Sequence, residues 1–142
     1  MKLELITLLG EKLNKDVYEV ILPTADGEIS VFPGHESLVT IAVPGVIGVR
    51  SERTDPDELL DYFAISGGVV EISGSNVRVL VDEAENGEDI VESESKAALE
   101  RAMAMRESAT SQVELEKAHQ LVDRHAVRLK VAELRRRRHR RQ

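Results

Sequence analysis

The sequence contains no cysteine and no tryptophan, and it has only two tyrosines and two phenylalanines. The absence of cysteine excludes a disulfide framework, a thiol nucleophile and a thiolate metal site. Typical metal ligands are then limited to four histidines, and these form no convincing cluster with acidic residues along the chain: His35, His119, His125 and His139. We therefore expect no metal site.

Long apolar runs are missing as well. No stretch approaches the roughly 18 apolar residues that a membrane-spanning helix needs, and Met1-Lys2 leads into no signal-like apolar core. We expect a soluble chain that stays in the cytoplasm. Its 142 residues suffice for one domain, or for a small domain with an appendage.

Proline and glycine are absent from the last third of the chain. No proline lies beyond Pro56, and the last glycine is Gly87. The charge changes sign at the same place, because residues 1–89 carry 6 Lys/Arg and 18 Asp/Glu whereas residues 90–142 carry 13 and 8. The net charge of −7 therefore conceals an acidic piece of −12 and a basic piece of +5. We predict two domains, over residues 1–88 and 89–142.

The first piece has the pattern of an all-β domain. Turn residues separate short runs rich in Val, Ile and Leu, which we predict to be strands at residues 2–9, 17–22, 28–32, 38–43, 46–52, 59–66, 69–73 and 77–81. Strands at this spacing favour an antiparallel β-sandwich or barrel. The small residues Ser66-Gly67-Gly68 between two strands indicate a bulge or a close backbone approach rather than a phosphate site.

The second piece has a helical period. Asp89 with Glu92, and Ser111 with Glu114, are candidate capping boxes for helices that begin near Ile90 and Gln112. The polar segment 107–111 would join them as an antiparallel hairpin. The predicted contact stripe consists of Ala98, Ala102 and Met105 on the first helix and Leu115, Ala118, Val122, His125, Leu129 and Ala132 on the second.

This stripe is rich in alanine, which limits how strongly the hairpin can dock. Burial of a leucine or valine contributes roughly 1.5 to 3 kcal/mol, and an alanine contributes much less. A shift of a two-state equilibrium from 1:99 to 99:1 requires about 5.5 kcal/mol. We therefore hypothesise that a modest ligand or partner can move the hairpin.

Residues 26–38 describe a turn, a short strand and a sharp corner at Pro33-Gly34-His35. Proline lacks an amide donor and glycine permits a reversal, so the strand must stop there. A histidine beside this stiff corner is expected to be exposed, which suits a docking surface.

The chain ends in six arginines within its last eight positions. A frayed, solvated tail is one interpretation. Nucleic-acid binding is another, since arginine neutralises phosphates, but all four aromatic residues lie in the acidic half and leave no stacking platform beside the arginines. An acidic surface on a protein partner accounts for the cluster better than nucleic acid does.

Six segments in this order make the chain similar to the epsilon subunit of bacterial F-type ATP synthases. They are Gly27-Glu28-Ile29, Phe32-Pro33-Gly34-His35 with Leu38, Pro44-Gly45-Val46-Ile47, Ser66-Gly67-Gly68-Val69-Val70-Glu71, Asn76-Val77-Arg78-Val79-Leu80 and Leu129-Lys130-Val131-Ala132-Glu133-Leu134. The resemblance implies an N-terminal β-sandwich and a C-terminal helical hairpin. It also implies a non-catalytic role in the central stalk that couples a proton-driven rotor to ATP synthesis.

The resemblance implies particular partners and a location. Glu28 corresponds to a family contact with the c-subunit ring and His35 to a contact with the gamma subunit, although Ser30 and Ser37 depart from the family pattern around them. The subunit would lie at the cytoplasmic face of the cell membrane, held there peripherally by the complex. From the residues alone, Glu28 could equally be a solvated turn carboxylate, and His35 a ring satisfied by local backbone.

In that family the two helices can extend into the catalytic head, where basic residues meet acidic residues of the beta subunits and block ATP hydrolysis. The alpha and beta subunits would then be partners as well. The candidate inhibitory residues are Arg124, Arg128, Lys130 and Arg135 to Arg138.

Some family members bind ATP through an Ile/Leu-Asp-x-x-Arg-Ala motif at the start of the first helix. Here Ile90 is kept, but Val91, Glu94 and Ser95 replace the aspartate, arginine and alanine. A carboxylate at Glu94 would repel phosphate, so we expect weak or absent ATP binding and no other cofactor. An independent enzyme is disfavoured because no nucleophile setting is recognisable. A nucleic-acid-binding adaptor that uses the arginine-rich helix is the alternative function.

Overall fold

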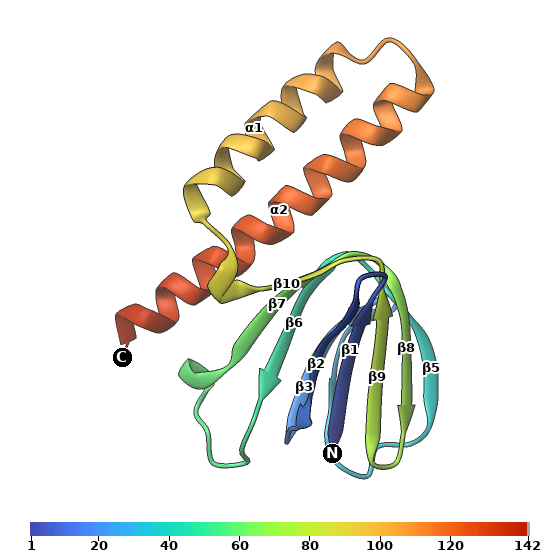
Figure 1. Ribbon diagram of the computed structural model, residues 1–142, viewed down its shortest axis with the longest axis vertical. Helices are drawn as coiled ribbons and strands as arrows, with labels where there is room; N and C mark the ends of the chain where they lie inside the picture. The colour runs from blue at the N-terminus through green and yellow to red at the C-terminus, as the bar shows by residue number, and fades with distance from the viewer. Residues whose placement is uncertain (142) are drawn as a thin grey trace.

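The computed structural model describes residues 1–141, with side chains through Arg137. Figure 1 shows a β-sandwich whose strands run roughly side by side, and a hairpin of two long helices that rises from one end of it. The second helix passes over the end of the sandwich, so its last turns lie beside the strands rather than above them. The predicted sandwich and helical hairpin are both confirmed.

Ten strands and two short 3₁₀ helices make up the sandwich part. The strands are β1 (Lys2–Thr7), β2 (Gly10–Asp16), β3 (Glu19–Thr24), β4 (Gly27–Val31), β5 (Leu38–Ala42), β6 (Gly45–Arg50), β7 (Asp61–Ile65), β8 (Gly68–Ser73), β9 (Asn76–Val81) and β10 (Ala84–Asn86), and the short helices are η1 (Asp57–Leu59) and η2 (Gly87–Asp89).

The strands follow the order β10-β7-β6-β3-β5-β8-β9-β1-β2, and β4 pairs with β3 off this path. Strand β3 links the two layers, because its first residues pair with β6 and its last residue, Thr24, pairs with Ala42 of β5. Pairing is antiparallel with one exception, since β1 and β9 run parallel. The N-terminal strand β1 therefore lies between β9 and β2. We call the strands from β5 to β2 in this order the second layer.

The core follows the strand period of two. Leu3 and Leu5 of β1 are fully buried between partly exposed neighbours, and the valines at 77, 79 and 81 alternate in the same way along β9. Valine and isoleucine suit such a pleated surface because their branched side chains pack against cross-strand neighbours. The core is therefore aliphatic, with Phe63 as its aromatic member among the described residues.

Two strands were missed by the sequence analysis. Strand β2 is an exposed edge strand of charged and polar residues, so it lacks an apolar face to detect. Strand β10 has only three residues. The predicted first strand was also too long, because β1 ends at Thr7 and Leu8 and Leu9 occupy the following turn, 81% and 93% exposed.

The turn chemistry of the sequence is confirmed at two places. Gly34 has φ +88°, a backbone conformation that glycine alone adopts readily, and its amide donates to the carbonyl oxygen of Gly74. At Gly68 a Cβ would overlap the carbonyl oxygen of Leu80. The Ser66-Gly67-Gly68 segment is thus a close backbone approach, as predicted.

Helix α1 (Glu92–Ser108) starts two residues later than predicted, and α2 (Gln112–Arg141) starts where predicted. The Asp89–Glu92 capping box was wrong, because Asp89 lies in η2 and the N-cap of α1 is Val91, without a side-chain cap. The Ser111 cap is confirmed, since its hydroxyl accepts from the amide of Glu114 at 3.2 Å. The Glu114 carboxylate in turn accepts from the amide of Thr110 at 2.9 Å.

The hairpin packs largely along the predicted stripe. Ala102 of α1 and Ala118 of α2 are fully buried, and Leu115, Val122 and Leu129 are half-buried. Met105 was assigned wrongly, because its side chain is 47% exposed. The stripe therefore ends one turn before the loop.

Candidate functional site

The helical hairpin docks on the sandwich through a small apolar cluster. Val131 and Ala132 of α2 are fully buried there against Ile90 and Ala64 of β7, and half-buried Val46, Tyr62 and Val127 surround them. Val131 lies outside the predicted stripe, and Ala132 was assigned wrongly to the face toward α1, because this end of α2 meets the sandwich. Only a handful of side chains take part, so apolar burial holds the hairpin to the sandwich modestly.

Two arginines of α2 bind carboxylates on and beside strand β10. Arg128 contacts Glu85 in a bidentate pair with N–O distances of 2.7 and 3.1 Å. Arg124, one helical turn earlier, contacts Glu83 at 2.7 Å. The spacing matches because four residues of helix rise about 6.0 Å and two residues of strand about 6.8 Å. The spacing of the two arginines along α2 thus matches the spacing of the two carboxylates at the edge of the sandwich.

Two further arginines secure the last turns of α2. Arg135 donates from one nitrogen to the carbonyl oxygens of Gly87 at 2.6 Å and Ile90 at 2.8 Å. Arg136 pairs with Glu92 at the start of α1 at 2.9 Å. We call Arg124, Arg128, Arg135 and Arg136 the arginine latch.

The other predicted inhibitory residues differ in their surroundings. Lys130 and Arg137 are exposed. The side chain of Arg138 lies outside the described residues. The sequence analysis selected Arg124 and Arg128 but did not detect that carboxylates on and beside β10 are their partners within the chain. The signal available was the alternation Glu83-x-Glu85, which places both side chains on one face of a strand.

The latch is weaker than the number of contacts suggests. Arg124 and Glu83 are each about half exposed, at 50% and 56%, so solvent screening limits their pair to less than about 1 kcal/mol. The Arg128–Glu85 pair is more enclosed and bidentate, and contributes roughly 1 kcal/mol. The ionic contacts select the docked geometry more than they stabilise it.

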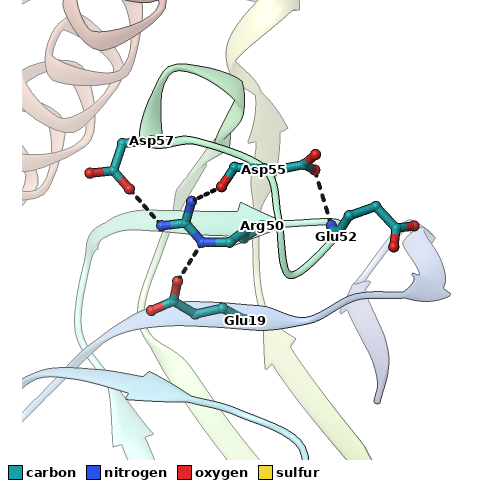
Figure 2. Close-up of polar contacts among 5 residues, drawn as sticks. All are labelled: Glu19, Arg50, Glu52, Asp55 and Asp57. Atoms are coloured by element: carbon teal, nitrogen blue, oxygen red, sulfur yellow. Dashed lines mark hydrogen bonds and ion pairs between the residues drawn. The ribbon is translucent and has the colours of Figure 1, made fainter.

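A separate ionic cluster fixes the loop between β6 and β7, next to α2 (Figure 2). Arg50 donates to Glu19 at 2.9 Å, to the carbonyl oxygen of Asp55 at 2.6 Å and to Asp57 at 2.6 Å. The pKa of Arg50 is raised, first by the hydrogen bond to Asp57 and then by that to Glu19. Because η1 begins at Asp57 and contacts α2, this cluster holds one wall of the hairpin's docking site.

Glu28 lies near the start of β4, whereas His35 follows the end of that strand, so the two are not brought together. Glu28 is exposed and lies across from Pro23 of β3. His35 is half-buried rather than exposed, and its Nδ1 lies 2.6 Å from the carbonyl oxygen of Glu36. Since a carbonyl can only accept, Nδ1 carries the hydrogen in this contact, and in the neutral ring Nε2 is then an acceptor.

The outer face of the second layer carries a row of apolar side chains that the sequence analysis missed. The strand register aligns them across β5, β8, β9 and β1, and we call them the apolar band: Ile41, Val69, Leu80 and Ile6. Ile41 is 61% and Val69 39% exposed. The available signal was that four of the five residues 38–42 are apolar, on both sides of Thr40, instead of alternating with polar residues, which indicates a strand covered on both faces.

Below the apolar band the same strands align charged side chains. Glu71 lies opposite Arg78, which lies opposite Glu4, and Arg78 contacts Glu4 at 3.2 Å. Val39, 71% exposed, stands beside this row on β5. The face therefore offers a hydrophobic strip bordered by ordered charges, which is the composition of an interaction surface.

The four positions of the degenerate ATP motif do not converge on one site. Ile90 and Ser95 are buried in packing, whereas Val91 and Glu94 are exposed. Glu94 does line a shallow cavity between the helices with Arg101, His125 and Arg128. The negative charge of Glu94 would repel a phosphate group in this cavity. Arg128 is already paired with Glu85 and is not available to bind phosphate.

The described residues contain no group of three or more His, Asp or Glu side chains that could hold a metal ion. In the same part of the chain, neither helix combines the length and the hydrophobicity needed to cross a lipid bilayer.

Comparisons with known proteins agree on one family. The β-sandwich domain of the ATP synthase delta/epsilon chain matches residues 1–87. The ATP synthase epsilon chain of Herpetosiphon aurantiacus is 34% identical over 97% of this chain and 98% of its own, and that of Thermodesulfovibrio yellowstonii is 38% identical over 72% and 69%.

Solved structures agree with the sequence relatives. A chain in the cryo-EM structure of the Euglena gracilis mitochondrial ATP synthase, which comprises OSCP, F1 and the c-ring, is 26% identical with a TM-score of 0.78 and coverages of 92% of this chain and 79% of that chain. A chain from the central stalk and c-ring of the Tetrahymena thermophila enzyme, 13% identical, shares the fold with a TM-score of 0.59, over 93% and 96% of the two chains.

Proposed function

This chain belongs to the ATP synthase delta/epsilon family as an epsilon subunit, and we propose that its sandwich docks on the gamma subunit and the c-subunit ring while its hairpin restrains ATP hydrolysis. An epsilon subunit is a non-catalytic part of the central stalk. Its task is therefore mechanical and regulatory, and it depends on surfaces rather than on reactive groups.

The apolar band is our candidate for the gamma-subunit contact. Exposed side chains such as Ile41 and Val69 contribute favourably only when a partner removes them from water, by roughly 25 cal/mol per Å² of apolar surface. The charged row of Glu71, Arg78 and Glu4 borders the strip and would fix the orientation of the partner. His35 would add a polar contact through Nε2.

Glu28 is our candidate for the c-ring contact. It is exposed at the start of β4, directly after the turn at Gly27, whose φ of +117° makes the approach sharp. The turn at Gly27 is sufficient to account for the exposed position of the Glu28 carboxylate. Attachment through the rotor, at the cytoplasmic face of the cell membrane, accounts for a membrane location in a chain whose described helices do not span a bilayer.

The docking proposal is tested by Val69→Lys, which places a charge within the apolar band without entering the core. The matched control is Val113→Lys, because Val113 is also exposed, at 70%, but lies on α2 away from the band. After detergent extraction, we expect V69K to lose at least tenfold in recovery with the gamma subunit and V113K to be recovered normally. Equal recovery of both variants would refute the band as the contact.

The arginine latch carries the regulatory part of the proposal. In the docked hairpin its four arginines are engaged by this chain's own carboxylates and carbonyl oxygens, so they cannot also bind a catalytic head. Three of the four have carboxylate partners, so a beta-subunit surface that takes over these contacts must be acidic. The absence of aromatic residues from the basic part of the chain favours a protein partner over nucleic acid.

The regulatory proposal is tested in the assembled enzyme. Deletion of residues 112–142 should leave assembly intact and raise ATP hydrolysis. Glu85→Gln should lower hydrolysis severalfold, because it weakens the docked state by about 1 kcal/mol and frees Arg128. Glu100→Gln, on the exposed side of α1, serves as the charge-matched control. Unchanged hydrolysis in the deletion variant would contradict inhibition by this hairpin.

We also propose that this subunit binds ATP weakly or not at all. The support is the carboxylate of Glu94 in the cavity between the helices and the prior engagement of Arg128 by Glu85.

A further inference from the structure

The contact between the two helices contains unpartnered polar atoms. Among the described residues, Ser95 Oγ and His125 Nδ1 are the buried side-chain nitrogen or oxygen atoms without a hydrogen-bond partner. Ser95 is completely buried on α1, and His125 is a half-buried residue of α2. A buried polar atom without a partner lowers the stability of the packing around it.

The helix register places these two residues at the same level of the hairpin. Ala102 lies six residues before the end of α1 at Ser108, and Ala118 lies six residues after the start of α2 at Gln112. Ser95 and His125 each lie seven residues, or about two turns, farther from the loop. Both therefore fall on the inner stripe of an antiparallel helix pair.

The charges around His125 are mainly positive. Its own helix contributes Arg124 and Arg128, α1 contributes Arg101 and Glu94, and β10 contributes Glu85. Glu94 is exposed, and both carboxylate oxygens of Glu85 already accept from Arg128. Among the described residues, no ion pair joins His125 to Glu94, and Glu85 is already engaged by Arg128.

Burial lowers the pKa of His125 below its ordinary value of 6.5, and Arg128, Arg124 and Arg101 lower it further, whereas Glu85 opposes them. The neutral ring needs a hydrogen on only one of its nitrogens. The protonated ring carries one on both, so Nδ1–H would lie in the buried α1–α2 contact, where Nδ1 has no hydrogen-bond partner.

We propose that His125 makes the α1–α2 contact sensitive to pH, so that acidification protonates the imidazole between three arginines and loosens α1 from α2. The device lies within this chain and does not depend on the proposed action on the catalytic head. It operates below about pH 6.5, because histidine ordinarily titrates near that value and the pKa of His125 lies lower.

The direction follows from proton linkage. A folded-state pKa below the unfolded value means that the closed hairpin binds fewer protons than the open one. Its stability is fully present above about pH 6.5 and is lost as pH falls toward the folded-state pKa. One linked proton changes the closing equilibrium by at most about tenfold per pH unit.

The experiment measures amide hydrogen exchange of the full chain at pH 7.5 and 5.5, expressed as protection factors so that the intrinsic pH dependence of exchange cancels. We expect the protection of α1 amides to fall severalfold at pH 5.5, up to the limit of about tenfold, while β9 amides in the sandwich keep theirs. His125→Gln should abolish this fall. His119→Gln, the same substitution at an exposed histidine of α2, should retain it.

Two further measurements keep the inference falsifiable if H125Q does not fold. Arg101→Gln removes one of the three repelling cations and should reduce the loss of protection. A titration of the wild-type ring by nuclear magnetic resonance should give His125 a pKa below 6.5. Equal protection of α1 at both pH values, or a ring that titrates at or above 6.5, would overturn the proposal.

Discussion

Gly87 controls how closely the hairpin approaches the sandwich. It lies at the start of η2, and a Cβ there would stand 2.8 Å from Cγ1 of Val131 and 3.0 Å from the carbonyl oxygen of Tyr62. Val131 is fully buried and branched at Cβ, so its methyl group cannot swing away freely. The substitution Gly87→Ala should therefore push α2 off the sandwich.

The expected magnitude follows from overpacking. One extra carbon in a well-packed site costs about 1 to 3 kcal/mol, which raises the detachment equilibrium of α2 roughly 5- to 150-fold. Val131→Ala should cost about 1.5 to 3 kcal/mol through lost burial and the space left behind. In the double variant the removed methyl groups make room for the new one. Its cost should therefore fall at least about 1 kcal/mol below the sum of the two single costs.

Hydrogen exchange of α2 amides measures this detachment, with β9 amides as the reference for the intact sandwich. Detachment without unfolding should expose α2 amides in G87A while the sandwich keeps its protection. The reasoning is refuted if G87A protects α2 as well as the wild type does, or if the two substitutions add without compensation.

Three other predictions follow from named contacts. Arg50→Met leaves the carboxylate of Glu19, a residue only 7% exposed, without its partner. The free energy of unfolding, measured in urea, should therefore fall by about 3 kcal/mol. The control Arg78→Met, on the exposed charged row, should lower it by less than about 1 kcal/mol. Equal effects would show that the Arg50 cluster is not structural. Calorimetric titration with ATP and magnesium should detect no micromolar binding, and such an affinity would disprove our assignment of Glu94. The pKa of Glu114 is lowered by hydrogen bonds from Thr110, so the contact between the Glu114 carboxylate and Thr110 should persist above about pH 4.5 and weaken as the pH falls further. The amide chemical shift of Thr110 would report this change, and no change on acidification would exclude the contact.

The sequence predicted the parts of the fold that have local signals. Branched apolar runs identified most strands, and the Ser111–Glu114 spacing located the start of α2. The edge strand β2 had no apolar face to detect, and Asp89 imitated a cap although the chain there forms η2. These misses have one cause, because edge pairing and helix starts depend on neighbours that are remote in sequence.

The candidate site was predictable only in part. The sequence selected the arginines of α2 because a dense run of one charge is visible in one dimension. It did not reveal that Glu83 and Glu85 face them, since that contact joins residues more than forty positions apart. The apolar band was hidden for the same reason, because Ile41 and Ile6 fall in one row only through the register of β8 and β9, which lie between them.

The sequence by itself determined two pieces of opposite net charge, an aliphatic sandwich, an amphipathic hairpin and the family to which the chain belongs. The charge division, the sandwich and the hairpin follow from composition and from periods of two and 3.6 residues, which are local, whereas the family follows from the order of its matching segments. Only the tertiary structure decided that the hairpin lies against the sandwich with its arginines engaged, that Gly87 sets their separation, and that His125 is enclosed among cations. The physical reason is that burial, charge pairing and steric fit act through space between segments whose separation along the chain carries no signal of their contact.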